Sequence, residues 1–219
     1  HKPDDVTAAV AEYVLQNNGD SDHWSHNSNR PPTEASDFTT TYVALRGLAA
    51  FGTAEQRTRI AQRRNTVLQW LLKTKTSDTE DRVFQLRALF HAQAEAQTQQ
   101  TFASQLIAAQ RKDGGWAQKV DMMSDAYATG TVLACLAQTG HLAPTSAGYQ
   151  RGLQFLLQSQ KPDGSWLVES RSKPFQKYFE TGFPHGVNQF VSTSATAWAT
   201  IALIESLSKL SSTQPSDDE

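Results

Sequence analysis

Three aspartates recur at the same place in a repeated pattern, each in a Ser-Asp pair that precedes an apolar run with helical spacing: Asp37, Asp78 and Asp125. If the helices that follow lie side by side, their carboxylates meet at one end. Clustered carboxylates raise one another's pKa and can form an acid or a cation site. An aspartate before a helix is equally explained as an N-cap. Both interpretations stay open, with Asp37 and Asp125 as the candidate catalytic acids.

A second group of candidate catalytic or binding side chains lies in the long segment 167–191. The segment is rich in aromatic residues, so we expect it to pack over one end of the helices. His185 is its candidate catalytic residue, because histidine suits proton transfer near neutral pH. A structural lid, whose polar side chains satisfy buried backbone groups, is the alternative. The candidate ligand- or partner-binding residues here are Tyr178, Glu180, His185, Asn188 and Gln189.

Two histidines in the polar segment 17–36 have the types of ligand that bind zinc, copper or nickel. His23 and His26 stand close to Asp20 and Asp22 in this segment. A His-x-x-His spacing is common by chance in polar loops. We therefore predict a solvated loop rather than a metal centre, and no cofactor.

Composition excludes several classes of protein. The chain has 219 residues, 20 Lys and Arg, 22 Asp and Glu, and one cysteine. A net charge of −2 argues against a nucleic-acid partner, because phosphate binding needs a basic face. The single cysteine excludes a disulfide framework within the chain and a cysteine-cluster metal site. No apolar run approaches about 20 residues, so we predict no transmembrane segment.

The elements that position these residues are all predicted to be helices, because apolar residues recur with helical and not strand-like spacing. The first helices of the predicted hairpins cover about residues 5–18, 54–74, 97–111 and 145–161. The second helices cover about residues 37–51, 79–93, 125–139 and 193–209. The second set is richer in Ala, Gly and Thr, so we expect it to form an inner layer. Four aromatic residues would then face the interior, as core or as the lining of an apolar ligand site: Tyr42, Phe84, Tyr127 and Trp198.

A repeat is visible in two D-G-x-W turns, each at the end of a first helix. The two tryptophans are 50 positions apart. Repetition at a fixed period is the signature of an array of similar structural units. The residues shared by the two copies are Gln110, Gly114 and Trp116 in the first, and Gln160, Gly164 and Trp166 in the second.

The second copy, from Arg151-Gly152 through Phe155-Leu156 to Trp166, resembles the QW repeat of the terpenoid-cyclase and protein-prenyltransferase superfamily. Trp70-Leu71 and the stretch that ends at Trp24 look like degraded copies. The runs 30–39, 124–130 and 178–186 are typical of bacterial prenyltransferase/squalene oxidase repeat proteins. The resemblance implies an α/α toroid in which the glutamine caps the outer helix and the tryptophan packs near it.

The chain departs from the catalytic patterns of that superfamily. It has neither the D-x-D-D acid of squalene–hopene cyclases nor the D-C-T-[AS]-E motif of oxidosqualene cyclases. Prenyltransferases bind zinc through a D-x-C pair, whereas Cys135 lies in an apolar run without such an aspartate. The resemblance therefore does not extend to the superfamily's chemistry.

We predict an all-α fold, a partial toroid of about four helical hairpins over residues 1–210 with a disordered acidic tail over 211–219. The favoured function is a non-catalytic binding or assembly module, which holds a protein partner or an upstream domain through its concave face and the 167–191 segment. The alternative is an enzyme or carrier for an apolar, isoprenoid-like ligand, so whether the chain is an enzyme stays open. The resemblance favours an exported bacterial protein.

Overall fold

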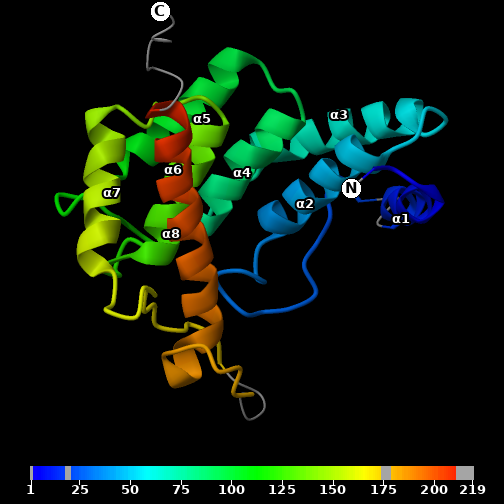
Figure 1. The fold of residues 1–219 in the computed structure, drawn as a ribbon. Helices are drawn as coiled ribbons and strands as arrows, with labels where there is room; N and C mark the ends of the chain where they lie inside the picture. The colour runs from blue at the N-terminus through cyan, green and yellow to red at the C-terminus, as the bar shows by residue number, and fades with distance from the viewer. Residues whose placement is uncertain (1, 18–20, 174–178, 211–219) are drawn as a thin grey trace, which may run out of the picture. The chain divides into compact units, whose positions relative to one another are not determined.

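The computed structural model describes residues 2–17, 21–173 and 179–210, and within them the fold is α-helical (Figure 1). The helices are α1 Asp5–Gln16, α2 Asp37–Phe51, α3 Arg57–Lys73, α4 Thr79–His91, α5 Ala96–Ala108, α6 Ala126–Gln138, α7 Ala147–Ser159 and α8 Gln189–Leu210. One 3₁₀ turn, Gly186–Asn188, leads into α8. The all-α prediction is confirmed, and so is every predicted helix.

Two details differ from the sequence-based expectation. Strand β1, Trp116–Ala117, pairs antiparallel with β2, Ser124–Asp125, and forms a two-residue ladder that period-two alternation is too short to reveal. Helix α8 begins at Gln189 rather than near residue 193. Ser192, which precedes the predicted helix, lies inside α8, where its Oγ accepts a hydrogen bond from the Val168 N–H at 3.2 Å.

The chain divides into two compact units, residues 1–102 and 103–219, which are described separately. In the first unit α2 packs against α4, while α1 and α3 pack against α2 and against each other. In the second unit α6 packs against α8, and α7 contacts both. The second helices of the hairpins therefore pair with one another inside each unit, as the sequence predicts. The proposed boundary at residue 210 stays a prediction, and the tail 211–219 lies outside the described residues.

Helix α6 illustrates why the inner helices are built from small residues. Every residue from Ala126 to Ala137 is buried. At Gly130 a Cβ atom would lie only 2.7 Å from the backbone nitrogen of Ala199 on α8. Because no side chain fits there, the two backbones can approach closely, and the fully buried helix needs the small side chains that surround this glycine.

Three tryptophans tie an outer helix to the inner helix that follows it. The indole N–H of each donates to a carbonyl near the end of its outer helix: Trp24 to Val14 at 3.0 Å, Trp116 to Leu106 at 2.8 Å and Trp166 to Leu156 at 2.8 Å. The backbone N–H of each donates to a threonine hydroxyl: Trp24 to Thr41 at 3.2 Å, Trp116 to Thr129 at 2.9 Å and Trp166 to Thr196 at 3.1 Å. These contacts give the hairpins a common register.

The second hairpin uses a different tie. Trp70 does not cap its helix in this way, and stacks instead on His23 at 4.3 Å between ring centroids. The amide of Gln85, buried in α4, donates to the carbonyls of Leu71 at 2.7 Å and Thr74 at 3.1 Å. The Leu71 carbonyl accepts this amide as the Leu156 carbonyl accepts the indole N–H of Trp166. Gln85 thus replaces the tryptophan, while Trp70-Leu71 keeps the position of Phe155-Leu156 in the repeat.

Helix α8 is long and apolar. The window Gly186–Leu207 is the one stretch among the described residues with the length and composition of a membrane-spanning helix, and 33% of it is buried. In the structure this helix packs against α6 and α7. A core helix passes the same test of length and composition, so the expectation that the chain has no transmembrane segment stays a prediction.

Candidate functional site

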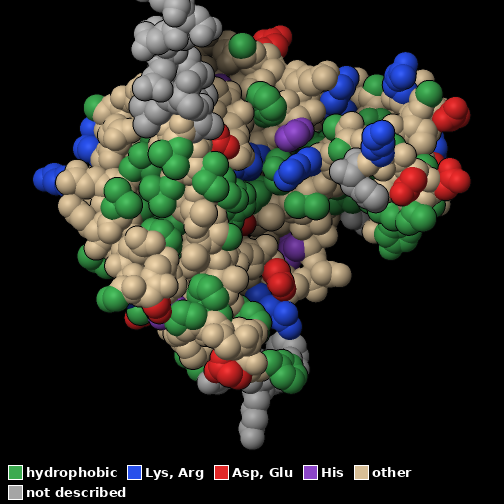
Figure 2. All heavy atoms as spheres, viewed as in Figure 1, with side chains coloured by type: hydrophobic (Ala, Val, Ile, Leu, Met, Phe, Trp, Pro, Cys, Tyr) green, Lys and Arg blue, Asp and Glu red, His purple; other side chains and the backbone are tan. Residues whose placement is uncertain are grey.

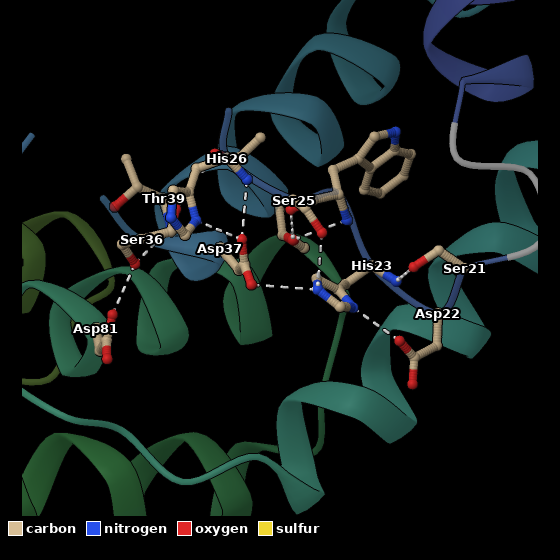
Figure 3. A network of polar contacts seen from close by, with 12 residues as sticks. Ser21, Asp22, His23, Ser25, His26, Ser36, Asp37, Thr39 and Asp81 are labelled. Carbon is tan, nitrogen blue, oxygen red and sulfur yellow. Dashed lines mark hydrogen bonds and ion pairs between the residues drawn. The ribbon is translucent and has the colours of Figure 1, made fainter. Parts of the chain in front are cut away.

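The residues at the start of α2 take part in a network of polar contacts (Figure 3). Asp37 Oδ1 accepts hydrogen bonds from the backbone N–H of His26 at 2.9 Å and from its Nδ1 at 2.6 Å. Asp37 Oδ2 lies 3.4 Å from Nε2 of His23. Nδ1 of His23 lies 2.7 Å from Asp22 Oδ1. A single carboxylate, shared by two imidazoles, therefore fastens the segment before α2 to the start of that helix.

The environment of Asp37 favours its ionised form. Partial burial raises its pKa, but the hydrogen bonds from the backbone and side chain of His26 and the charges of His26 and His23 together lower it below the usual value. At neutral pH Asp37 is thus an acceptor that holds the loop. Its expected role as a proton-donating acid is not the role that this arrangement favours.

The two histidines point at this carboxylate rather than at a common vacant point. No group of three or more His, Cys, Asp or Glu side chains among the described residues has an arrangement that could hold a metal ion. Asp20, which the sequence placed near His23 and His26, lies outside the described residues. The two histidines thus have a structural role, because they attach the loop to Asp37 of α2.

Two buried carboxylates connect α2 to α4, and sequence reasoning missed both. Thr39 Oγ1 donates to Glu80 at 2.9 Å, and Ser36 Oγ donates to Asp81 at 2.7 Å. Both acids follow Asp78, whose side chain accepts the N–H of Asp81 at 3.1 Å as the N-cap of α4. A run of three acids among four residues was the available signal, but only the fold shows that two of them face a neighbouring helix.

Asp125 is the N-cap of α6 in the second unit. Its Oδ1 accepts the N–H of Ala128 at 2.9 Å, and its Oδ2 accepts the amide of Gln118 at 3.1 Å. The other end of that amide accepts a hydrogen bond from Arg171 Nε at 2.6 Å. Burial raises the pKa of Asp125, and the opposing effects of these hydrogen bonds and of the charge on Arg171 do not reverse it. Gln118 and Arg171 had no signal in the sequence, because their contacts join distant segments.

His185 lies in a different setting from a catalytic base. Its Nε2 is 2.7 Å from Ser165 Oγ, and that hydroxyl is 2.6 Å from Asp163 Oδ1. The Ser165 hydroxyl donates to Asp163, and the hydrogen bonds from Ser165 lower the pKa of that carboxyl. With its proton directed at Asp163, the hydroxyl presents its oxygen to His185. A serine nucleophile would need the opposite direction of proton donation, so this trio serves as a structural clamp.

The other polar candidates of the 167–191 segment also bind the segment itself. Asn188 Oδ1 accepts the N–H of Ser170 at 2.9 Å, and Glu180 Oε1 accepts the N–H of Gly182 at 3.0 Å. Gln189 is fully buried, and its Oε1 accepts the N–H of Thr181 at 2.6 Å. Tyr178 lies outside the described residues. The structure thus matches the lid interpretation, with polar groups that satisfy the backbone.

Three of the four interior aromatic candidates pack as core in their own units, and Trp198 does not. Tyr127 is buried in α6, and Trp198 on α8 is partly exposed. Tyr42 contacts Phe84 with ring centroids 5.3 Å apart, and the guanidinium of Arg87 lies over both rings. These contacts stabilise the pairing of α2 with α4.

Comparison with known proteins defines the class. The sequence model of the squalene-hopene cyclase C-terminal domain matches residues 44–214, and the chain belongs to this family. The resemblance to the terpenoid-cyclase superfamily and its all-α toroid-type fold is therefore confirmed.

A curated relative agrees with this family. Lanosterol synthase erg7A of Aspergillus fumigatus is 36% identical over 96 residues, which cover 44% of this chain and 12% of that protein. The chain thus corresponds to a small part of that relative, and the activity named for the whole enzyme is not thereby assigned to it.

Proposed function

We propose that this cyclase-type domain is a non-catalytic binding or assembly module that holds a protein partner through the 167–191 segment and the adjoining face of its last hairpin. The observation that carries the proposal is the orientation of that segment's side chains. Glu180, Asn188 and Gln189 accept backbone N–H groups of the segment, while several of its apolar side chains face outward. Phe179 is 68% exposed, Val187 64% and Phe190 54%.

Exposed apolar side chains continue from the segment along α8. Ile204 and Leu207 are 56% and 64% exposed. Figure 2 shows hydrophobic side chains along this helix. Contiguous exposed apolar patches are rare on isolated soluble proteins, and they mark sites of protein or membrane interaction. An apolar surface beside a segment in which Glu180, Asn188 and Gln189 accept backbone N–H groups fits a binding role better than acid–base chemistry.

The second candidate is an enzyme or carrier for an isoprenoid-like ligand. The family favours it, and so does Asp125, because a buried carboxyl with a raised pKa is able to donate a proton. Its weakness is that Asp125 already caps α6 and accepts a hydrogen bond from Gln118. The other candidate acid, Asp37, is held ionised.

A photo-crosslinking experiment tests the binding function. A photoreactive phenylalanine analogue replaces Phe190, and in a matched control it replaces Val120, which is 96% exposed outside the surface in question. In cells that produce the protein naturally, we expect one polypeptide to crosslink through position 190 and not through position 120. Crosslinks to lipid alone, or the same products from both positions, would contradict a protein-binding role.

An activity assay tests the alternative. The purified chain is incubated with linear isoprenoid hydrocarbons and prenyl diphosphates, beside Asp125→Asn and His185→Ala. We expect no cyclised or transferred product from any of them. Product formation that Asp125→Asn abolishes would establish the enzyme.

A further inference from the structure

The two D-G-x-W turns of the second unit have the same local geometry. Gln110 Nε2 donates to the Gly114 carbonyl at 2.9 Å, and Gln160 Nε2 donates to the Gly164 carbonyl at 2.9 Å. Gly114 and Gly164 both have positive φ, at 86° and 83°. The turns are thus equivalent, and any difference in their surroundings comes from what packs on them.

The first turn is covered by the next outer helix, α7. Gln110 donates to the Gly148 carbonyl at 2.7 Å, and Arg151 Nη2 donates to Gln110 Oε1 at 2.5 Å. A Cβ on Gly114 would lie 2.5 Å from the carbonyl oxygen of Arg151. Gly114 is therefore buried under α7, and the contact depends on a small residue followed three positions later by arginine.

The second turn has no such cover among the described residues. Gly164 is exposed, and a Cβ placed on it would meet no heavy atom within 4 Å. Gln160 is exposed as well, and its amide hydrogen bonds back to the Gly164 carbonyl. Leu157, one turn earlier on α7, is 57% exposed. The surface that binds a helix in one repeat is thus open in the other.

The inner helices show the same asymmetry. Thr129 on α6 and Thr196 on α8 hold equivalent tryptophans, so Gly130 on α6 corresponds to Ala197 on α8. Gly130 is buried against the α8 backbone, whereas Ala197 is exposed. Along α8, exposed residues continue from Ala197 at seven-residue intervals, which place them on one helix face: Phe190 and Ile204.

We propose that this open edge of the last hairpin, formed by Leu157, Gln160, Gly164, Phe190, Ala197 and Ile204, docks a helical hairpin of a partner protein. The inference rests on the proposed binding function and specifies the chemistry of the partner. Its outer helix carries a small residue and, three positions later, arginine or lysine that bonds Gln160. Its inner helix lays a face of small residues against Ala197.

Ser165 restricts the size of the partner side chain that can pack on the open turn. In the covered repeat Phe155 of α7 packs over Gly115, where a Cβ would lie 3.0 Å from the phenyl ring. The equivalent position in the open turn is Ser165, which has a Cβ and is bonded to His185. The partner helix therefore carries a residue smaller than phenylalanine at this position.

The experiment supplies a hairpin of known chemistry as the probe. In an extended chain, a copy of residues 139–210 in which alanine replaces Phe155 follows Glu205, the position that corresponds to Gln138 in the repeat. We expect amide exchange in the appended hairpin to slow by about 100-fold or more relative to an unstructured chain. Ala197→Glu with Ile204→Glu should remove that protection, while Val120→Glu should leave it intact.

A finer variant tests the predicted arginine contact. Replacing the appended copy of Arg151 by alanine should reduce protection about tenfold, and should have little further effect when Gln160→Ala is already present. Exchange at the unstructured rate in the appended hairpin would overturn the proposal. Equal protection in the edge variant would also overturn it, because the hairpin would then fold without docking.

Two results separate this inference from the function on which it rests. If position 190 crosslinks one polypeptide but the appended hairpin does not dock, the hairpin chemistry is wrong and the binding function stands. If the unextended chain self-associates and Ile204→Glu prevents it, a second copy is the occupant and the partner proposal is overturned.

Discussion

Asp37 and Asp125 occupy the same position in the repeat but bind different groups. Each lies four residues before the threonine that receives a tryptophan N–H, Thr41 in one hairpin and Thr129 in the other. Asp125 caps its own helix, α6. Asp37 leaves the capping of α2 to Ser36 and binds two histidines of the preceding segment.

The position in the repeat thus sets where each carboxylate lies, whereas the residues around it set its hydrogen bonds and its pKa. Histidines hold the pKa of Asp37 below its usual value, whereas burial raises the pKa of Asp125. Equivalent backbone positions thus place Asp37 and Asp125 in two different electrostatic environments. One environment lowers the pKa of its carboxyl through histidines of a loop, and the other raises the pKa of its carboxyl through burial.

The largest expected effect tests the tryptophan contacts that the two hairpins share. Trp24→Ala and Trp116→Ala should each lower the free energy of unfolding of their own unit by about 3–5 kcal/mol, because both indoles are buried and bonded to an outer helix. Hydrogen exchange resolved by residue would report each unit separately. A loss confined to one of the two variants would show that the hairpins are not equivalent.

A smaller effect separates the two aspartates. Asp125→Ala should cost about 0.5–2 kcal/mol and speed exchange at Ala128, because α6 loses its N-cap. Asp37→Ala should leave the first turn of α2 protected, since Ser36 caps it, and should speed exchange at His26 instead. Fraying of α2 in Asp37→Ala would remove the distinction.

The smallest expected effect is the dependence on pH, which should have opposite signs. The pKa of Asp37 is lowered in the folded state, so its stabilisation is present above the ordinary value of 3.8 and is lost as the pH falls through the folded pKa. The pKa of Asp125 is raised, so its contribution is present below 3.8 and is lost as the pH rises through the folded pKa.

Asparagine variants read out these signs. Between pH 3 and 7, the deficit in the free energy of unfolding of Asp37→Asn relative to the unmodified chain should grow as the pH rises. For Asp125→Asn, the free energy of unfolding should increase relative to that of the unmodified chain over the same range. Chemical denaturation monitored in each unit is the measurement, and parallel curves for either variant would contradict the assigned direction.

The sequence was sufficient for the helices and insufficient for the use of their polar residues. Helical spacing and Ser-Asp caps are local signals, so all the helices were predicted. A Ser-Asp pair does not reveal which of its two residues caps, and this is where Asp37 was grouped with Asp125. The partners of Asp37, Asp125 and Ser36 (His26, Gln118 and Asp81) come from other segments, so only the fold brings them together.

The 167–191 segment shows the same limit in another form. Its aromatic composition predicted a packed segment, whereas Phe179 and Phe190 are exposed; the lid interpretation anticipated that its polar groups bond the backbone. The outward direction of Phe179 and Phe190 depends on which residues the turns at Gly182 and Gly186 send inward. Composition alone gives no such direction.

The stacking of His23 on Trp70 gives the chain an optical reporter. The two rings are nearly parallel, with 8° between their planes, and His23 also contacts the carboxylate of Asp37. An imidazole ring stacked on an indole quenches its emission, so the brightness of Trp70 follows the position of this histidine. Release of the loop from α2 would thus be visible as a change in fluorescence, without any added label.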